Sequence, residues 1–423
     1  MRIAIIYNNA THIHCLTGFC MNLAHITRFS VIPLVALLGG VLTVLSACGG
    51  SSAENANPLS AKAQLGEKIF HDVSLSASGQ QSCASCHESA NGHAQANALP
   101  AQLGGVHLTL QGNRTSPSLR YLATNTAFHF DAEGTPTGGF FFDGRATSLQ
   151  DQARGPFLNP LEMANTSIAE VVQRLEKSAY ADAFRAVYGQ QVFNQPEVAF
   201  TFMTEALALY QKEDADFNAY TSKYDEYLRG KVTLNTQEAR GLALFRDQTK
   251  GNCAACHPAD KAADGSHPLF TDFTYDNLGL PRNMALQQNA NPAFFDLGLC
   301  DRSTGDLKER TELCGAFKVP SLRNVGLRKT FFHNGSFQSL EEAVRFYVQR
   351  DTHPEKWYPR KADGSVDSYN DVPALYKANV NTTEAPYDRK WGDMPALSDS
   401  EIQDVVAFLL TLNDGYVSTP SRK

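Results

Sequence analysis

The chain has 423 residues, of which 43% are hydrophobic and 19% charged, and its formal net charge is −7. This length is enough for two domains of ordinary size. The acidic balance argues against nucleic-acid binding, because such a surface needs an excess of Lys and Arg. It suits a basic protein partner, although scattered solvated charges are its more common cause.

The first 47 residues are predicted to be an export signal. Residues 31–47 are apolar and uncharged, Arg28 precedes them, and they end in Leu-Ser-Ala before Cys48. This ending resembles a bacterial lipobox, so 1–47 is predicted to be a lipoprotein signal peptide and Cys48 to carry the lipid. Residues 48–58 form a small, polar tether. The sequence therefore predicts a periplasmic protein anchored to a bacterial membrane through lipid on Cys48. An uncleaved membrane anchor is the alternative.

Two Cys-x-x-Cys-His runs stand out along the mature chain. They consist of Cys83, Cys86 and His87, and of Cys253, Cys256 and His257. In such a run both thiols bind a haem covalently and the histidine is the proximal ligand of the iron. A zinc or thiol-redox site is the alternative for a single run. Two runs about 170 residues apart, both behind an export signal, predict two covalently bound c-type haems, roughly one for each domain-sized unit.

Helical patterns precede both runs. An apolar face is expected over residues 61–70 before the first run, and a similar segment over 239–245 precedes the second. Both segments contain Gly-x-x-x-Phe, starting at Gly66 and at Gly241. This repetition indicates a duplicated cytochrome c unit.

Further helices are expected after the capping boxes that begin at Ser167, Ser339 and Ser398, and over the apolar residues 198–210. Strand signals are few, and Gly, Pro, Asn and Asp are frequent elsewhere. The predicted fold is mainly α, with two cytochrome c-like haem domains and long connecting loops. The predicted domains are 59–232 and 233–423.

The remaining cysteines indicate one disulfide. Cys15 and Cys20 leave with the signal peptide, so Cys300 and Cys314 are the only two without a predicted partner. In an oxidising compartment such a pair, separated by a short loop, is most simply a disulfide. A metal or redox role is the alternative, although no further Cys or His lies close by.

Five stretches between and after the haem motifs follow the order found in one family. They are residues 141–146 (FFDGRA), 149–156 (LQDQARGP), 159–163 (NPLEM), 317–325 (FKVPSLRNV) and 332–336 (FHNGS). With the two haem motifs, they resemble the dihaem bacterial cytochrome c peroxidases and their relative MauG. The resemblance covers about residues 65–412.

This resemblance implies that the first haem, on His87, reacts with peroxide. Gln152, Pro156 and Glu162 fall where the family keeps its distal-pocket residues. Cleavage of a bound peroxide needs a group that takes a proton from the near oxygen and returns one to the far oxygen, and a carboxylate such as Glu162 can do both. Gln152 would hold the peroxide by hydrogen bonds, and Pro156 would limit crowding over the iron. A surface carboxylate is the alternative for Glu162.

His107 resembles the family's removable sixth ligand on the first haem. Such a ligand blocks peroxide until reduction elsewhere releases it, which makes a two-state gate. His93 is the rival for this position, and a surface histidine in a loop is the structural alternative.

The second haem keeps His257 as its proximal ligand, and Tyr347 stands at the family's other axial position. Tyr347 follows Leu340 at helical spacing on an apolar stripe, which fits both a ligand and a packed core tyrosine. Met394 is the alternative ligand. A phenolate favours high oxidation states of the iron, as in MauG. Phe142 stands where relatives have a tryptophan between the haems, so the route between them differs here.

Relatives also hold a calcium ion between the haems. The corresponding positions here are Thr115, Arg328 and Thr330, without the expected Asn and Pro. Backbone carbonyls can still bind a hard cation, so calcium is a candidate cofactor, with Arg328 counting against it.

The expected function is a dihaem c-type peroxidase that reduces hydrogen peroxide at the N-terminal haem, with electrons delivered through the C-terminal haem. A small cytochrome c or copper protein would be the donor. The alternative is a MauG-like, peroxide-dependent oxidase of a residue on a partner protein, which Tyr347 favours. A non-enzymatic dihaem electron carrier is a third hypothesis, and the Gln152, Pro156 and Glu162 set argues against it. The family often forms homodimers.

Overall fold

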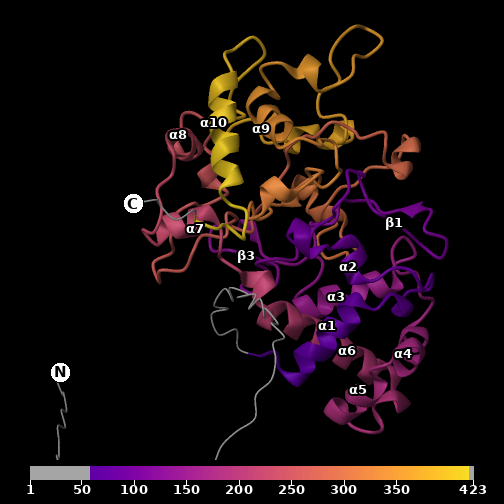
Figure 1. The fold of residues 1–423 in the computed structure, drawn as a ribbon. Coiled ribbons are helices and arrows are strands. Elements are labelled where there is room, and N and C mark those ends of the chain that lie inside the picture. Colours follow the sequence, from indigo (N-terminus) through magenta and orange to yellow (C-terminus); the bar gives the residue numbers. More distant parts are fainter. Residues whose placement is uncertain (1–57, 419–423) are drawn as a thin grey trace, which may run out of the picture. The chain divides into compact units, whose positions relative to one another are not determined.

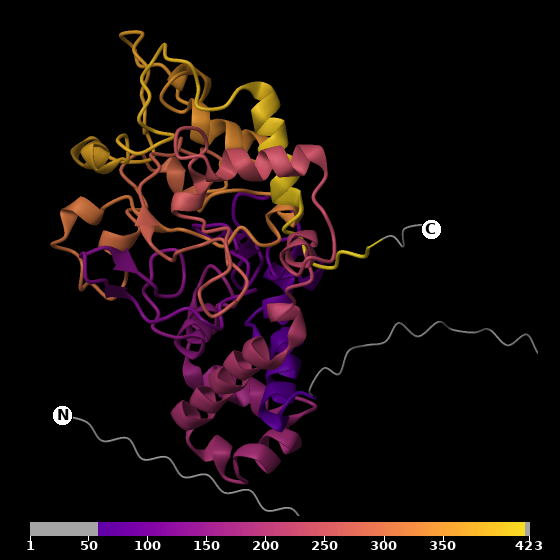
Figure 2. The ribbon, with the colours of Figure 1, turned by 90° about the vertical axis from the view of Figure 1, so that its left-hand side faces the viewer.

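The computed structural model describes residues 58–418 (Figures 1 and 2). The predicted signal peptide, the lipid-bearing Cys48 and nearly all of the tether lie outside these residues. The helices are α1 (Ala61–His71), α2 (Cys83–Cys86), α3 (Leu149–Leu158), α4 (Ile168–Glu176), α5 (Ala181–Tyr188), α6 (Pro196–Glu213), α7 (Lys223–Leu228), α8 (Thr236–Arg246), α9 (Leu340–Gln349) and α10 (Asp399–Leu410). None of the helices within 58–418 combines the length and apolarity needed to span a bilayer.

The strands of the described chain are short antiparallel pairs of two residues each. They are β1 (Leu103–Gly104) with β2 (Leu110–Gln111), β3 (His129–Phe130) with β4 (Pro136–Thr137), and β5 (Tyr275–Asp276) with β6 (Phe317–Lys318). Long loops and short 3-10 turns connect the rest. The prediction of a mainly helical fold with long loops is confirmed.

Two hydrophobic cores organise the described residues, and one helix pair lies at the centre of each. In the first core α1 packs against α6, and in the second α8 packs against α10. A Cβ atom on Gly66 would overlap the carbonyl of Ala206, and one on Gly241 would overlap the carbonyl of Asp404. The repeated glycine is therefore what lets each helix pair approach so closely.

Side-chain caps begin the predicted helices. The hydroxyls of Ser167, Ser339 and Ser398 each accept a hydrogen bond from the backbone three residues on. At Ser398 the box is complete, because Glu401 also accepts from the Ser398 backbone. The expected helices at residues 61–70, 198–210 and 239–245 are present as α1, α6 and α8.

The expected disulfide is present. Cys300 and Cys314 are bonded and lie 14 residues apart in sequence. The carbonyl of Cys314 accepts hydrogen bonds from Asn277 and Asn379, so the loop is also tied to its surroundings by polar contacts.

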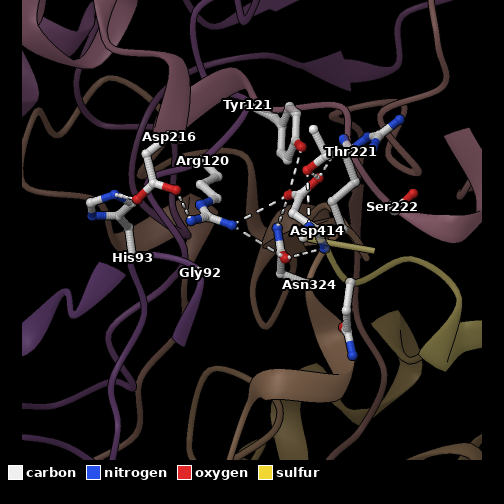
Figure 3. Close-up of polar contacts among 12 residues, drawn as sticks. Gly92, His93, Arg120, Tyr121, Asp216, Thr221, Ser222, Asn324 and Asp414 are labelled. Carbon is white, nitrogen blue, oxygen red and sulfur yellow. Dashed lines mark hydrogen bonds and ion pairs between the residues drawn. The ribbon is translucent and has the colours of Figure 1, made fainter. Parts of the chain in front are cut away.

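A polar network joins the first core to the end of the chain (Figure 3). Arg120 pairs with Asp216 and also lies 3.3 Å from an oxygen of Asp414. Asp414 accepts further hydrogen bonds from the Tyr121 hydroxyl and the Asn324 amide, both at 2.7 Å. Because the Arg120 and Asp414 side chains are buried, this network fixes residues about 300 apart in sequence against one another.

Candidate functional site

One cavity of about 710 Å³ is lined by both Cys-x-x-Cys-His motifs. The four motif cysteines are free thiols. Burial raises the pKa of Cys83 and of Cys253 to about 12, which keeps both thiols neutral. Unpaired thiols next to a histidine, on the wall of a large cavity, are what covalent haem attachment needs.

The histidine of the first motif is fixed in the tautomer that a metal ligand requires. His87 Nδ1 lies 3.1 Å from the carbonyl oxygen of His93 and 3.0 Å from that of Pro117. A carbonyl can only accept, so Nδ1 carries the hydrogen and Nε2 keeps its lone pair. Burial lowers the pKa of His87 to about 4, so the ring is neutral.

The second motif repeats this arrangement with a single acceptor. His257 Nδ1 lies 2.7 Å from the carbonyl oxygen of Phe270, and burial lowers the pKa of the ring. Both histidines therefore present a neutral Nε2, as haem iron requires. The cavity and both motifs fit two c-type haems.

The Glu162 carboxyl lines the cavity beside the first motif. Its charge contributes to raising the pKa of both Cys83 and Cys86, which shows how near it lies to them. The Asn159 amide donates to Glu162 Oε1 at 2.7 Å. Burial raises the pKa of Glu162 above its usual value, although Asn159 and Arg145 oppose the shift. The alternative of a surface carboxylate does not fit this position.

Helix α3 carries Gln152 and Pro156 along the same wall. They are four residues apart, so both face the cavity from one side of the helix. Pro156 has no N–H with which to close the helical hydrogen bond to the Gln152 carbonyl. Ser148 caps the start of α3. The structure thus places Gln152, Pro156 and Glu162 on the lining of the cavity that also holds the first motif.

The histidines predicted as rival sixth ligands lie elsewhere. His107 is exposed, in the turn between β1 and β2, and does not line the cavity. His93 is only 2% exposed, stacks on Phe217 and bonds Asp216 through Nε2 at 2.8 Å. In this conformation neither ring is placed as a ligand. His93 serves the site through its backbone carbonyl, which holds His87.

Tyr347 lies on α9 and lines the cavity beside the second motif. Asp276 and the two cysteines of that motif contribute to raising its pKa, after burial, well above the usual range. Its ring neighbours Phe332, at 5.5 Å between centroids, and Tyr387, at 6.0 Å. The alternative, Met394, is 80% exposed and outside the cavity, so it is not placed to act as a ligand.

A wall of charged residues, to which the sequence analysis gave no role, lies along the same cavity. Arg114 donates to Asp143 at 2.7 Å and to Asp296 at 2.7 and 2.8 Å. Burial lowers the pKa of Lys318 to about 7, and its amine donates to a backbone carbonyl. Haem carries two propionate carboxylates, for which such cations are the natural partners. Lys318 lies inside the quoted stretch 317–325, which is a signal that could have indicated it, whereas Arg114 lies outside all of the quoted stretches.

The fold and the cavity define a c-type cytochrome with two haem-attachment sites and an acidic group beside one of them. A family model described as di-haem cytochrome c peroxidase matches residues 60–233. The chain is 35% identical to the methylamine utilization protein MauG of Paracoccus denitrificans over 387 residues, which cover 90% of this chain and 95% of that protein. The chain therefore belongs to the dihaem cytochrome c peroxidase and MauG family, and it carries two haems.

Two further relatives agree. The chain is 31% identical to cytochrome c551 peroxidase of Nitrosomonas europaea, over 67% of this chain and 71% of that one. The crystal structure of the diheme peroxidase BthA from Burkholderia thailandensis E264 matches with a TM-score of 0.79 and 38% identity, covering 86% and 88% of the two chains. The protein is a peroxidase-type oxidoreductase.

Proposed function

We propose that this protein reduces hydrogen peroxide at the haem attached to Cys83 and Cys86, with Glu162 as the acid and base. Electrons reach that haem through the one attached to Cys253 and Cys256. The observation that carries this proposal is the Glu162 carboxyl, which Asn159 holds in the cavity beside the first motif. When bound, the haem supplies the iron that takes up peroxide and the two electrons that break its O–O bond.

Glu162 moves the protons of this reaction. It accepts the proton of the near oxygen of peroxide and returns it to the far oxygen, which already carries one hydrogen and so leaves as water. Because burial raises its pKa, the Glu162 carboxylate is a stronger base than an ordinary glutamate, so it takes the proton from the near oxygen more readily. Gln152 orients the peroxide by hydrogen bonding, and the ring of Pro156 keeps the approach uncrowded.

Two kinds of partner can supply the electrons. A small cytochrome c or copper protein would serve a peroxidase, as in the relatives named cytochrome c551 peroxidase. A residue on a partner protein would serve a MauG-like oxidase, and the phenol of Tyr347 beside the second motif favours this alternative, because a phenolate ligand lowers the potential of haem iron. His107 acts as a gate only if its loop moves toward the cavity.

The setting of the enzyme is also part of the proposal. A lipid on Cys48 would hold it at the membrane on the periplasmic side, with 59–232 and 233–423 as its haem domains and a homodimer as its assembly. The bonded pair Cys300 and Cys314 supports an oxidising compartment.

Replacement of Glu162 tests the central step. Glu162→Gln keeps the size and the Asn159 contact of the side chain but removes the proton acceptor. We expect peroxide turnover to fall by about 100-fold or more, while both haem spectra remain. Glu309→Gln, on an exposed glutamate, is the matched control and should behave as the wild type.

Mixing the fully ferric enzyme with one equivalent of peroxide separates the competing hypotheses. A spectral change without prior reduction supports the MauG-like alternative, and a change only after one-electron reduction supports the gated peroxidase. If neither state reacts, both the peroxidase and the MauG-like hypotheses are wrong. If Glu162→Gln turns over within twofold of the wild type, the proposed role of Glu162 is wrong.

A further inference from the structure

The positions that correspond to the calcium site of relatives have a different chemistry in this chain. Calcium takes six to eight oxygen ligands, usually with carboxylates among them. Among residues 58–418, no three His, Cys, Asp or Glu side chains are grouped so as to hold a metal ion. Thr115, Ser116 and Thr330 therefore offer a metal ion only backbone carbonyl and hydroxyl oxygens.

Arg328 already occupies the backbone oxygens of this site. Its Nε lies 3.2 Å from the carbonyl oxygen of Thr330. Its two terminal nitrogens lie 3.4 and 3.5 Å from the carbonyl oxygen of Ser116. One guanidinium thus donates to backbone carbonyl oxygens of two separate segments. A hard cation would bind oxygens of the same kind.

The threonine hydroxyls are also engaged. Thr115 Oγ1 donates to the carbonyl of Phe332 at 3.0 Å, and Thr330 Oγ1 donates to that of Leu99 at 3.3 Å. No carboxylate is among the groups that act on Arg328, whose pKa is lowered to about 10 by burial alone. The guanidinium is still charged at neutral pH, so a divalent cation at these oxygens would meet a fixed positive charge. The residues present do not fit calcium.

We infer that Arg328 replaces the inter-haem calcium ion, as a cation built into the chain. It ties residues 115–117 to residues 328–330, which precede α9, across 212 positions of sequence. The next residue after Ser116 is Pro117, whose carbonyl holds His87. Arg328 also contributes to lowering the pKa of His87, so its charge acts on the first haem's proximal ligand. Arg328 is therefore a positioning residue for the first haem, and this inference does not depend on which partner supplies electrons.

The first test needs no variant. We expect the purified holoenzyme, equilibrated with calcium and then passed through a desalting column, to contain less than about one calcium per ten chains by elemental analysis. The Tm should be the same with excess chelator as with added calcium. One calcium per chain, or a Tm that chelator lowers and calcium restores, would overturn the inference.

The second test asks whether the positive charge of Arg328 replaces that of the calcium ion. Arg328→Gln should lower the midpoint potential of the first haem, because loss of a nearby positive charge destabilises the reduced iron, and should lower the Tm. Arg328→Lys keeps the charge and should restore most of the potential. Arg360→Gln is the matched control, since Arg360 also donates to a backbone carbonyl but at the surface. If Arg328→Gln has the potential and Tm of Arg360→Gln, the inference fails, and if Arg328→Gln does not fold, the potential of Arg328→Lys and the metal content decide it.

Discussion

The two haem-attachment sites have the same scaffold but different surroundings. Each motif follows a helix whose glycine allows close packing, at Gly66 in one core and at Gly241 in the other. In each, the histidine Nδ1 donates to a backbone carbonyl. Yet the first motif faces the carboxyl of Glu162, whereas the second faces the phenol of Tyr347.

This difference shows that the attachment motif fixes where a haem is bound but not what it does. Burial raises the pKa of Glu162, which suits the proton transfer that we propose for it. Tyr347 lies among aromatic rings, and burial raises its pKa, so at neutral pH it stays protonated unless a metal binds it. The two motifs therefore have side chains of different chemistry beside them.

The shared scaffold gives the largest expected effect. Gly66→Ala and Gly241→Ala each gain about 1 kcal/mol in helix propensity, but the added methyl overlaps a carbonyl of the facing helix. Forcing the helices apart should leave a net loss of about 2 kcal/mol in the free energy of unfolding. Thermal unfolding followed at each haem band would detect it.

A glycine with room around it provides the control for this pair. The nearest atom to a Cβ on Gly112 would be 3.6 Å away, so Gly112→Ala should be tolerated. If Gly66→Ala or Gly241→Ala is as stable as Gly112→Ala, the close approach of the helices is not what the repeated glycine provides.

The second expected effect sharpens the contrast at Tyr347. Tyr347→Phe should raise the potential of the second haem and remove any phenolate absorption, because the ring keeps its packing but loses its oxygen. The spectrum of the first haem should not change. Tyr376→Phe, outside the cavity, is the matched control for optical and resonance spectra. Equal spectra for the two variants would exclude Tyr347 as a ligand.

The smallest expected effect is a shift in pH dependence at the first site. The acid limb of kcat/KM should lie above pH 4.5, since burial raises the pKa of Glu162 and the proton acceptor is lost as pH falls through it. The Asn159 amide stabilises the carboxylate, so Asn159→Ala should raise this pKa again and move the limb to higher pH. A limb that moves to lower pH, or not at all, would contradict this account.

Local signals in the sequence predicted much of the scaffold. Each haem-attachment motif is complete within five consecutive residues. The serine caps of α4, α9 and α10 likewise bond the backbone within one helical turn. Helix α3 escaped prediction, because Gly155 and Pro156 near its end weaken its propensity and packing on α6 stabilises it instead.

Contacts between distant segments could not be predicted in this way. Arg114 donates a hydrogen bond to Asp296, which lies 182 positions away in the sequence, and no local sequence pattern predicts such a pair. The sequence offers His93 as the rival of His107, but in the structure its ring is hydrogen-bonded to Asp216, 123 positions on. The family pattern located Glu162, whereas its hydrogen bond to Asn159 became visible only in three dimensions.

The long sequence separation between Asp414 and its partners constrains how the molecule is assembled. Tyr121 and Arg120 are synthesised early, but the carboxylate that they share arrives almost 300 residues later. Until then Arg120 has Asp216 as its nearest acidic partner, and the first core must hold its shape without this closing contact. Without the Asp414 carboxylate, the Tyr121 hydroxyl and the Asn324 amide would lose the acceptor that they share, so these buried donors are satisfied only after this late segment has docked.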